Sequence, residues 1–491
     1  MPVLAPSAMT LPSTAELLVA GGDTRIMLDA SGATMYGSRP RPDPGLVALG
    51  SCTASLISRA GLAAAEQLRT GLLEDLQQHG PAGLYALQLQ RLRTELQAAC
   101  GWTESEGIEL VLAASGTDLF LLASQWLQPQ RTVMICPNET GSGVPAAVQG
   151  RHFNALSACG DVLPMGAQVS AWSGELVPVS VRDDDGQPRP ADQIDAEFGA
   201  AVGAAALAGQ RVLLVLTDVS KTGMMVPSVA AALALKRRWP AQVEVLVDAC
   251  QFRLAPATLR AYLAHDCMVA VTGSKFMAGP TFCGALMVGP KLAARHAREA
   301  VGARIAAYSN AAEWPRAWPA ARGLPRRANF GLLLRWEATM PHLRSWAGLP
   351  PARALAFVRR FAQAVRARLD ADARFEAVPV PPLARAGLGI EPEWDTEQSI
   401  FPFLVIGPGG VLTAEQSKRL YVMLREPGDG GARYQLGQPV PCGERGGVRL
   451  AALRVCVDAP MLAAACSGGA DAALASVQGA FDRIGELLAR L

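Results

Sequence analysis

The stretch VTGSKFMAGPTFCGALMVGP, residues 271–290, decides the fold prediction for this chain. Two apolar runs flank a turn rich in glycine, and Lys275 lies in that turn with no other charged residue in the segment. Lysine is seldom buried without a partner. The segment therefore indicates two core strands and a lysine placed where the chain otherwise has the composition of a protein core.

Short apolar runs of this kind recur upstream, and the first of them are separated by segments long enough for helices. Near-continuous apolar strands that alternate with helices are typical of a mostly parallel sheet covered on both faces. The fold class is therefore α/β. The predicted strands are residues 108–114, 131–136, 211–218, 243–249, 267–273 and 283–289.

Apolar residues at helical spacing predict helices around this region. Residues 59–99 have such spacing with a break near His79–Pro81, and residues 115–127 form a turn that opens a helix after the first strand. Towards the C-terminus the same patterns predict a smaller α+β domain. Its elements are a helix at 351–375, strands at 400–406 and 448–457, and a final helix at 470–491.

The domain organisation follows from these elements. Residues 1–50 are rich in proline and glycine, which is typical of an extended arm. We predict an N-terminal arm and interface segment at 1–60, a large domain at 61–335 and a small C-terminal domain at 336–491.

Composition excludes several classes of protein. In 491 residues, 50% are hydrophobic and 18% charged, so a large buried core is expected and global disorder is not. The 45 basic and 43 acidic residues nearly balance, which argues against a nucleic-acid-binding protein. No long apolar stretch, secretion signal or metal-binding spacing of cysteine and histidine is present, so we expect a cytoplasmic protein with reduced thiols and no metal.

Small or polar residues follow each predicted strand, at the edge where open α/β sheets bind ligands. Three of these positions together point to pyridoxal phosphate (PLP): Asp248 ends one strand, Lys275 ends the next, and Ser115-Gly116-Thr117 opens a helix. Each alone has an ordinary structural explanation, as a helix cap, a lysine reaching the surface or a common turn. Their combination favours the cofactor.

The chemistry of PLP explains why these residue types are needed. A lysine amine forms a Schiff base with the cofactor aldehyde, and an apolar site makes that amine nucleophilic. A carboxylate facing the pyridine nitrogen, the role predicted for Asp248, keeps that nitrogen protonated. Backbone N–H groups at a helix N-terminus, here at Gly116 and Thr117, suit the phosphate.

The motif VDACQ (247–251) followed by TGSKFMAGP (272–280) resembles fold-type I PLP-dependent enzymes, in particular the class V aminotransferase and cysteine desulfurase group. The resemblance covers roughly residues 105–290. It implies a seven-stranded sheet and a homodimer with sites near the interface. It also implies that Lys275 forms the internal aldimine, that Asp248 pairs with the pyridine nitrogen and that Gln251 hydrogen-bonds the phenolic oxygen. The phosphate would be held at Gly116, Thr117, Thr272 and Ser274, the last replacing a usual histidine.

The sequence departs from the pattern of this group at two further cofactor positions. Thr140 stands where many members stack a histidine on the ring, and Ser220-Lys221-Thr222-Gly223 stands for their Asn-Glu-Thr-Gly. We expect Thr140 and Ser220 to contact the cofactor. The Gly-Thr-Pro turn of the group is not evident in 324–331, where Asn329 is the candidate substitute.

The C-terminal domain is expected to bind the substrate carboxylate through an arginine, since guanidinium binds carboxylate in a bidentate manner. The segment GGVRLAALRVCVDAP (446–460) offers Arg454 as the first candidate and Arg449 as its rival. Cys442 lies in a Gly/Pro-rich stretch and is either a free loop cysteine or, as in cysteine desulfurases, a persulfide carrier. Cys250, Cys267 and Cys283 lie in apolar runs and are expected to pack as small hydrophobic residues.

We therefore predict a PLP-dependent enzyme acting on an amino acid or related primary amine. The substrate amine would displace Lys275 to give an external aldimine, and Lys275 would then move the Cα proton while Asp248 stabilises the carbanionic quinonoid. Aminotransferase chemistry is the first expectation, and a lyase reaction (β- or γ-elimination, or desulfuration) is the alternative. A non-catalytic protein of the same fold is a third reading, whereas a dehydrogenase would need a Gly-x-Gly-x-x-Gly that residues 115–120 lack.

Overall fold

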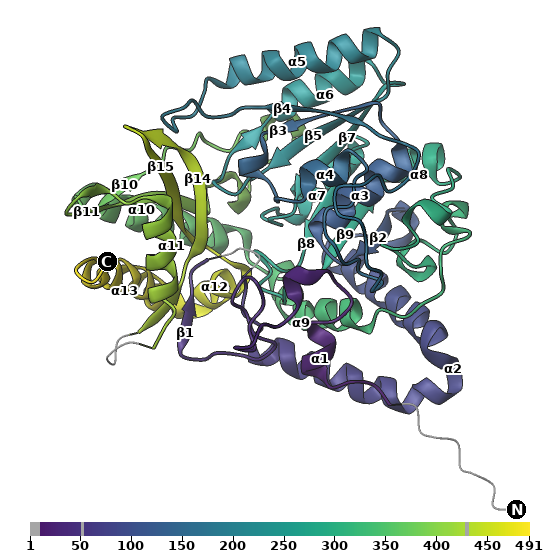
Figure 1. Cartoon of the computed structure of the whole chain (residues 1–491), viewed down its shortest axis with the longest axis horizontal. Helices are drawn as coiled ribbons and strands as arrows, with labels where there is room; N and C mark the ends of the chain where they lie inside the picture. Colours follow the sequence, from purple (N-terminus) through teal and green to yellow (C-terminus); the bar gives the residue numbers. More distant parts are fainter. Residues whose placement is uncertain (1–9, 51–53, 428–431) are drawn as a thin grey trace, which may run out of the picture.

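The computed structural model describes residues 10–50, 54–427 and 432–491. Figure 1 shows a large central sheet covered by helices, with the C-terminal strands forming a second sheet at one side. The strand order of the large sheet is β2-β9-β8-β7-β5-β3-β4, and the short β6 pairs with β5. The strands are β2 (Glu109–Ala113), β3 (Arg131–Ile135), β4 (Glu175–Val179), β5 (Val212–Asp218), β6 (Met225–Val226), β7 (Val243–Ala249), β8 (Met268–Thr272) and β9 (Gly284–Val288).

All six strands predicted from the sequence are confirmed, and within the seven-stranded path only β9 runs antiparallel to its neighbours. The strand β4 was not predicted. It lies at the edge of the sheet, is partly exposed and contains Pro178. A half-exposed strand lacks the continuous apolar run of a central one, and proline is tolerated only at such an edge.

The register of the parallel strands places the candidate residues at one edge. Asp248 on β7 pairs with Ala270 on β8 and with Thr217 on β5. Lys275 follows the end of β8 by three residues. Since parallel strands have their carboxyl ends on the same side, this pairing brings the ends of β5, β7 and β8 together.

Helices cover both faces of the large sheet. The predicted break in the long helix α2 is confirmed, because Gly80 adopts φ 62° and ψ 163° just before Pro81, which cannot continue the backbone hydrogen bonds. The helix α9 packs along α2 and passes through residues 335 and 336, the predicted boundary between domains. The helices are α2 (Arg59–Ala99), α3 (Gly116–Leu127), α4 (Val144–Val148), α5 (Ala191–Leu207), α6 (Val229–Arg238), α7 (Pro256–Ala264), α8 (Pro290–His296) and α9 (Phe330–Ala347).

The C-terminal region forms the predicted smaller α+β unit, whose antiparallel sheet has the order β10-β11-β15-β14, with β12 beside β11. One expectation was wrong: Cys442 lies not in a loop but buried on β14, where glycine and proline coincide with irregularities in the register. The elements are α10 (Pro351–Ala371), β10 (Phe375–Ala377), β11 (Ile400–Gly407), β12 (Gly410–Val411), α11 (Ala414–Met423), β13 (Arg433–Gln435), β14 (Gly437–Arg445), β15 (Val448–Cys456), α12 (Ala459–Ala464) and α13 (Ala470–Leu488).

The described part of the N-terminal segment is more ordered than the extended arm that its composition predicted; residues 1–9 and 51–53 of the predicted 1–60 segment lie outside the described residues. It contains α1 (Thr14–Leu18), capped by Ser13, and β1 (Leu46–Ala48), which pairs in parallel with β13. The buried Arg335 of α9 donates hydrogen bonds to the carbonyl oxygens of Ala20 (2.5 Å) and Gly21 (2.9 Å). These bonds hold the segment against the large domain.

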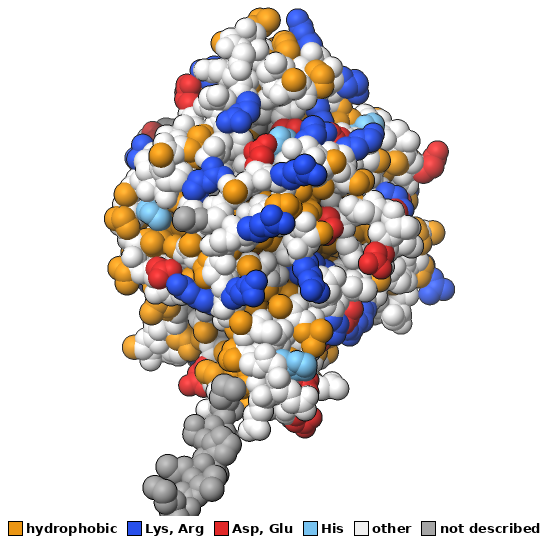
Figure 2. Space-filling model, turned by 90° about the vertical axis from the view of Figure 1, so that its right-hand side faces the viewer, with side chains coloured by type: hydrophobic (Ala, Val, Ile, Leu, Met, Phe, Trp, Pro, Cys, Tyr) orange, Lys and Arg blue, Asp and Glu red, His pale blue; other side chains and the backbone are white. Residues whose placement is uncertain are grey.

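In the face shown in Figure 2, Lys and Arg side chains lie among hydrophobic, acidic and uncharged ones. Within residues 10–50, 54–427 and 432–491, no helix has both the length and the apolar character needed to cross a bilayer. The same residues contain no cluster of His, Cys, Asp or Glu arranged to hold a metal ion.

Candidate active site

A cavity of about 230 Å³ lies at the carboxyl edge of the large sheet, where the turns after β2, β3, β5, β7 and β8 face β14 and β15 of the C-terminal sheet. Ten residues predicted from the sequence to contact the cofactor or substrate line it, whereas Asn329 and the rival Arg449, which is exposed, lie outside its lining. These predicted residues are Gly116, Thr117, Thr140, Ser220, Asp248, Gln251, Thr272, Ser274, Lys275 and Arg454.

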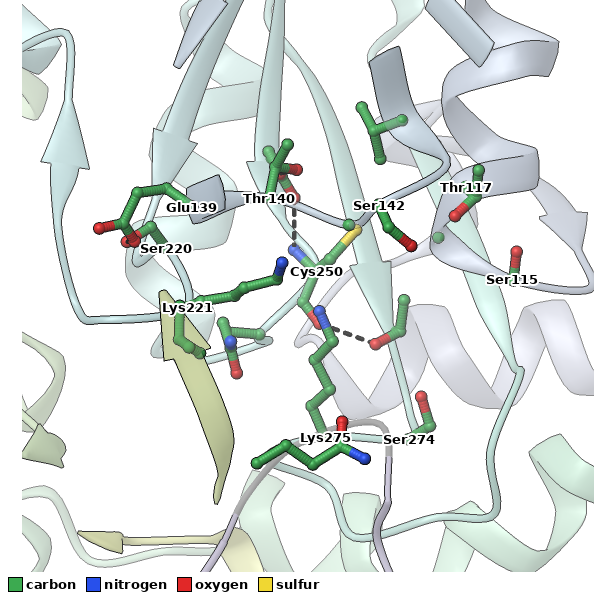
Figure 3. Close-up of a pocket in the computed structure, with 18 of the residues that line it drawn as sticks. Ser115, Thr117, Glu139, Thr140, Ser142, Ser220, Lys221, Cys250, Ser274 and Lys275 are labelled. Carbon is green, nitrogen blue, oxygen red and sulfur yellow. Dashed lines mark hydrogen bonds between the residues drawn. The ribbon is translucent and has the colours of Figure 1, made fainter. Parts of the chain in front are cut away.

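Lys275 reaches into this cavity from the turn after β8 (Figure 3). The turn is held tightly, because the N–H of Gly273 donates to the Cys283 carbonyl (2.9 Å) and that of Gly279 to the Gly273 carbonyl (2.8 Å). A Cβ on Gly279 would lie 1.9 Å from the Thr339 hydroxyl of α9, so only glycine fits there. Phe276, next to Lys275, is buried and donates its N–H to the Gln251 carbonyl at 3.3 Å. The lysine therefore projects from a fixed backbone.

Asp248 lies near the end of β7 and is 8% exposed. One carboxylate oxygen accepts the backbone N–H of Cys250 at 3.2 Å, and the other accepts the hydroxyl of Thr140 at 3.4 Å. Both donors orient the carboxylate group. No ion pair joins Asp248 to a basic side chain in the described part of the chain, so its charge is available to a bound cationic group.

The amide of Gln251 completes this wall of the cavity. Its Oε1 atom is buried and makes no hydrogen bond within the described residues. A buried polar atom without a partner carries a free-energy cost, which a ligand group can remove. The neighbouring hydroxyl of Thr272 donates to the Cys250 carbonyl at 2.7 Å and holds the two strand ends together.

The turn between β2 and α3 forms the opposite wall. Ser115 caps α3: its Oγ accepts the Asp118 N–H at 3.2 Å and hydrogen-bonds the Asp118 carboxyl group. A Cβ on Gly116 would lie 3.1 Å from the Cys250 sulfur, so glycine keeps this corner open. Burial, and secondarily the charge of Asp23, raises the pKa of Asp118 to about 7, which weakens the negative charge behind an anion-binding turn.

Arg25, which sequence reasoning missed, also lines the cavity at this turn. Its guanidinium forms a bidentate pair with Asp23, donates to the Thr117 hydroxyl at 3.3 Å, and lies 4.6 Å from the ring centre of Phe282. It comes from the N-terminal segment, some 90 residues before α3 in sequence. No local pattern in GGDTRI could have placed it there.

Ser220 lies in the cavity wall, but its hydroxyl donates to the Glu139 carboxylate at 2.7 Å. Glu139 also accepts the Thr222 hydroxyl at 2.7 Å and pairs with Arg182 at 3.3 Å. This buried network fixes the loop that carries Lys221. A contact between Ser220 and a cofactor stays a prediction.

Lys221 and Arg454 form the side of the cavity nearest the C-terminal sheet. Arg454 donates to the carbonyl oxygens of Lys221 (2.9 Å) and Gln438 (2.8 Å). The Lys221 amine contacts the Asn138 carbonyl at 3.3 Å. Burial, together with the charges of Arg454 and Lys275, lowers the pKa of Lys221 to about 8. The sequence singled out Lys221 only as part of a replaced motif and assigned it no role.

Asn329, the candidate substitute for the Gly-Thr-Pro turn, lies outside this cavity. It caps α9 by accepting the Leu332 N–H at 2.9 Å and donates to the Gly21 carbonyl at 3.0 Å. Its side chain therefore has a structural role in the described chain.

Comparison with known proteins places the fold. No protein-family model and no curated protein matches this chain. Among solved structures, Oryza sativa TDC with PLP and tryptamine matches at 14% identity and TM-score 0.52, over 91% of this chain and 84% of that one. Sphingomonas wittichii serine palmitoyltransferase matches at 12% identity and TM-score 0.53, over 91% of this chain and 88% of that one.

A NifS-like protein from Rickettsia africae matches at 9% identity and TM-score 0.51, over 90% of this chain and 99% of that one. These three structures share nearly the whole length of the chain, so the predicted fold of fold-type I PLP-dependent enzymes is confirmed. At such low identity the likeness establishes the fold, and the chemistry has to be argued from the cavity itself.

Proposed function

We propose that this protein is a PLP-dependent enzyme that transfers the amino group of an amino acid or related primary amine. One observation carries the proposal: Lys275, Asp248, Gln251 and the N-terminus of α3 line a single cavity. A protein that had only kept the fold would have no need to bring an amine, a carboxylate, an amide and an anion-binding turn together.

The residues of the cavity fit PLP. The unpartnered Oε1 of Gln251 marks an amide with spare hydrogen-bonding capacity, and Gly116 leaves room at the anion-binding turn. Lys275 would bond to the cofactor aldehyde carbon, Asp248 would face the ring nitrogen, and Gln251 the phenolic oxygen. The phosphate would lie at the residues that line the turn and the end of β8, namely Gly116, Thr117, Thr272 and Ser274.

When bound, PLP supplies an electron sink for the negative charge left at the substrate Cα. The protein supplies the rest. Asp248, oriented by the Cys250 N–H and the Thr140 hydroxyl, holds a proton on the ring nitrogen. The Lys275 amine takes the proton from the substrate Cα and returns one. The strand β14 lines one side of the cavity with Pro439, Val440 and Pro441.

Two described cysteines, Cys250 and Cys442, favour amino transfer over desulfuration. A sulfur acceptor has to be a reactive thiolate that can reach the substrate. Cys250 lines the cavity, but burial raises the pKa of its thiol well above the usual range. Cys442 is buried on β14 outside the cavity lining, and burial raises its pKa to about 11.

The cofactor assignment is tested by reducing the PLP-treated protein with borohydride and mapping the label by peptide mass spectrometry. We expect the label on Lys275 and its complete loss in Lys275→Ala. The variant Lys291→Ala, at an exposed position of α8, serves as the matched control and should label like the wild type. An unlabelled wild-type protein, or a label that survives in Lys275→Ala, would reject the proposal.

The reaction is tested with amino acids in the presence of a 2-oxo acid acceptor. Amino transfer yields a new amino acid without free ammonia, whereas elimination releases ammonia. If ammonia is the sole nitrogen product, amino transfer is rejected and the reaction is that of a lyase. The homodimer and the cytoplasmic location expected from the sequence stay predictions, of which the first is checked by the molar mass of the protein in solution.

A further inference from the structure

We propose that Lys221 and Arg454 together recognise a substrate with two acidic groups, so that the enzyme acts on an amino dicarboxylate or an equally dianionic amine. This inference rests on the proposed function and names its substrate class. It starts from the charges that line the cavity and from the partners that each of them already has.

Four cationic side chains line the cavity, against two carboxylates, Glu139 and Asp248. Glu139 is taken by Arg182 from outside the cavity. Of the cations, Arg25 is paired with Asp23. The three others, which have no ion pair to a carboxylate within the described residues, are Lys221, Lys275 and Arg454.

Lys221 lies away from the residues that would hold the cofactor phosphate. In Figure 3 its side chain reaches into the cavity from the side opposite Ser115 and Thr117, where the phosphate would bind. Lys275 would lose its charge as the cofactor's covalent partner, and Asp248 would be matched by the protonated ring. Two cations, Lys221 and Arg454, are then left for the substrate.

These two cations are held as a unit. The Arg454 guanidinium bonds to the backbone carbonyl of Lys221, so β15 fixes the loop that presents the lysine. Arg454 is 3% exposed, and its Nε makes no hydrogen bond within the described residues. Buried cations without an anion are unfavourable. Burial, and then the charges of Arg454 and Lys275, lower the pKa of Lys221, so this amine also lacks a stabilising anion.

A substrate with one carboxylate would neutralise only one of the two cations and leave the other, the partly buried Lys221 or the buried Arg454, without an anion. A second carboxylate or a similar oxyanion removes this cost. Because both cations border β14 and β15, the acidic groups would approach from the side of the C-terminal sheet. The expected substrate therefore carries its amine towards Lys275 and its two anionic groups towards Lys221 and Arg454.

The test measures binding of two unreactive probes to the PLP-loaded protein by calorimetry: succinate, with two carboxylates, and butyrate, with the same number of carbons and one. We expect succinate to bind about tenfold more tightly than butyrate. In Lys221→Met the affinity for succinate should fall to that for butyrate, while butyrate binding stays unchanged. Arg454→Met should weaken both probes, and Lys221→Arg should keep the preference.

The matched control is Lys418→Met, at an exposed position of α11, which should leave both affinities unchanged. Equal affinity of the wild type for the two probes would overturn the inference, and so would a preference for succinate that survives in Lys221→Met. The wild-type ratio decides the matter even if that variant fails to fold. Borohydride labelling of Lys275 is read separately, so a labelled protein without the preference rejects this inference alone, and an unlabelled protein rejects the proposed function.

Discussion

The two ends of strand β7 carry carboxylates that differ in their ion pairs. Glu244, near its start, is surrounded by basic groups: Lys236 lies at 2.7 Å, Arg295 at 2.9 Å and the His296 ring nitrogen at 3.0 Å. Asp248, near its end, meets only a backbone N–H and a hydroxyl, in a cavity where Lys221, Lys275 and Arg454 have no ion pair to a carboxylate within the described residues. One strand thus connects a cluster of paired charges around Glu244 to a cavity that contains cations without a paired carboxylate.

The pKa values differ accordingly. Burial alone would raise the pKa of Glu244, but the hydrogen bond from His296 and the charges of Lys236 and Arg295 lower it to about 2. At the other end, burial and then the like charges of Arg454 and Lys275 lower the pKa of Lys221 to about 8. Paired charges indicate a structural role, whereas convergent charges without counterions indicate a place for a ligand.

The largest effect is expected at Asp248. Asp248→Asn keeps the shape of the side chain but cannot hold a proton on the ring nitrogen, so exchange of the substrate Cα hydrogen with solvent deuterium should slow by about 10²-fold or more. Mass spectrometry of a substrate amino acid in deuterium oxide measures this rate. Labelling of Lys275 should persist, and an unchanged exchange rate would show that the end of β7 has no chemical role.

The pH dependence of anion binding sharpens the same comparison. Because the pKa of Lys221 is lowered to about 8, this amine is charged below that pH and loses its charge above it. The preference for succinate over butyrate should therefore decline about fivefold as the pH rises from about 7 to about 9.

The groups that act on Lys221 are Arg454, Lys275 and Glu139. Guanidinium groups do not lose a proton in proteins, so butyrate binding should change little. In Lys221→Arg the preference should become independent of pH. A preference that rises with pH would contradict the assignment of this amine.

The smallest effect is expected at Glu244, and it concerns stability alone. Glu244→Gln removes the anion from a partly buried cluster and should lower the free energy of unfolding by about 2 kcal/mol, less than for a fully buried pair because Arg295 is 39% exposed. Denaturant unfolding measures the change. Lys275 labelling and the succinate preference should stay as in the wild type, and a loss of either would blur the contrast between the two ends of β7.

The direction in which the pKa values of Glu244 and His296 are shifted determines how the stability contributed by this cluster depends on pH. The pKa of Glu244 is depressed in the folded protein, so its contribution is present above the usual carboxyl range and is lost as the pH falls towards 2. Burial alone would lower the pKa of His296, but hydrogen bonds to Glu244 and Glu299 raise it, so that contribution is lost as the pH rises through the raised value. The free energy of unfolding of the wild type should decline in both directions. In Glu244→Gln most of the decline at low pH should be absent.

Much of the large domain could be predicted because its signals are local. Continuous apolar runs mark six strands of the large sheet, and the residues after them mark the carboxyl edge, so Asp248 and Lys275 were found from their places at two strand ends. The strand β14 escaped prediction because its glycines and prolines resemble a loop, and its Cys442 was misplaced for the same reason.

The sequence by itself determined the strands of the large sheet and the places of Asp248 and Lys275 at two strand ends, because apolar runs and the polar residues that follow them are neighbours in the sequence. Only the tertiary structure decided the charge of the cavity. Arg25 arrives there from the N-terminal segment, Lys221 from a loop held by Arg182, and Arg454 from a strand more than 200 residues further along the chain. Electrostatic energy depends on distance in space, so no local pattern reveals which cations meet without a counterion.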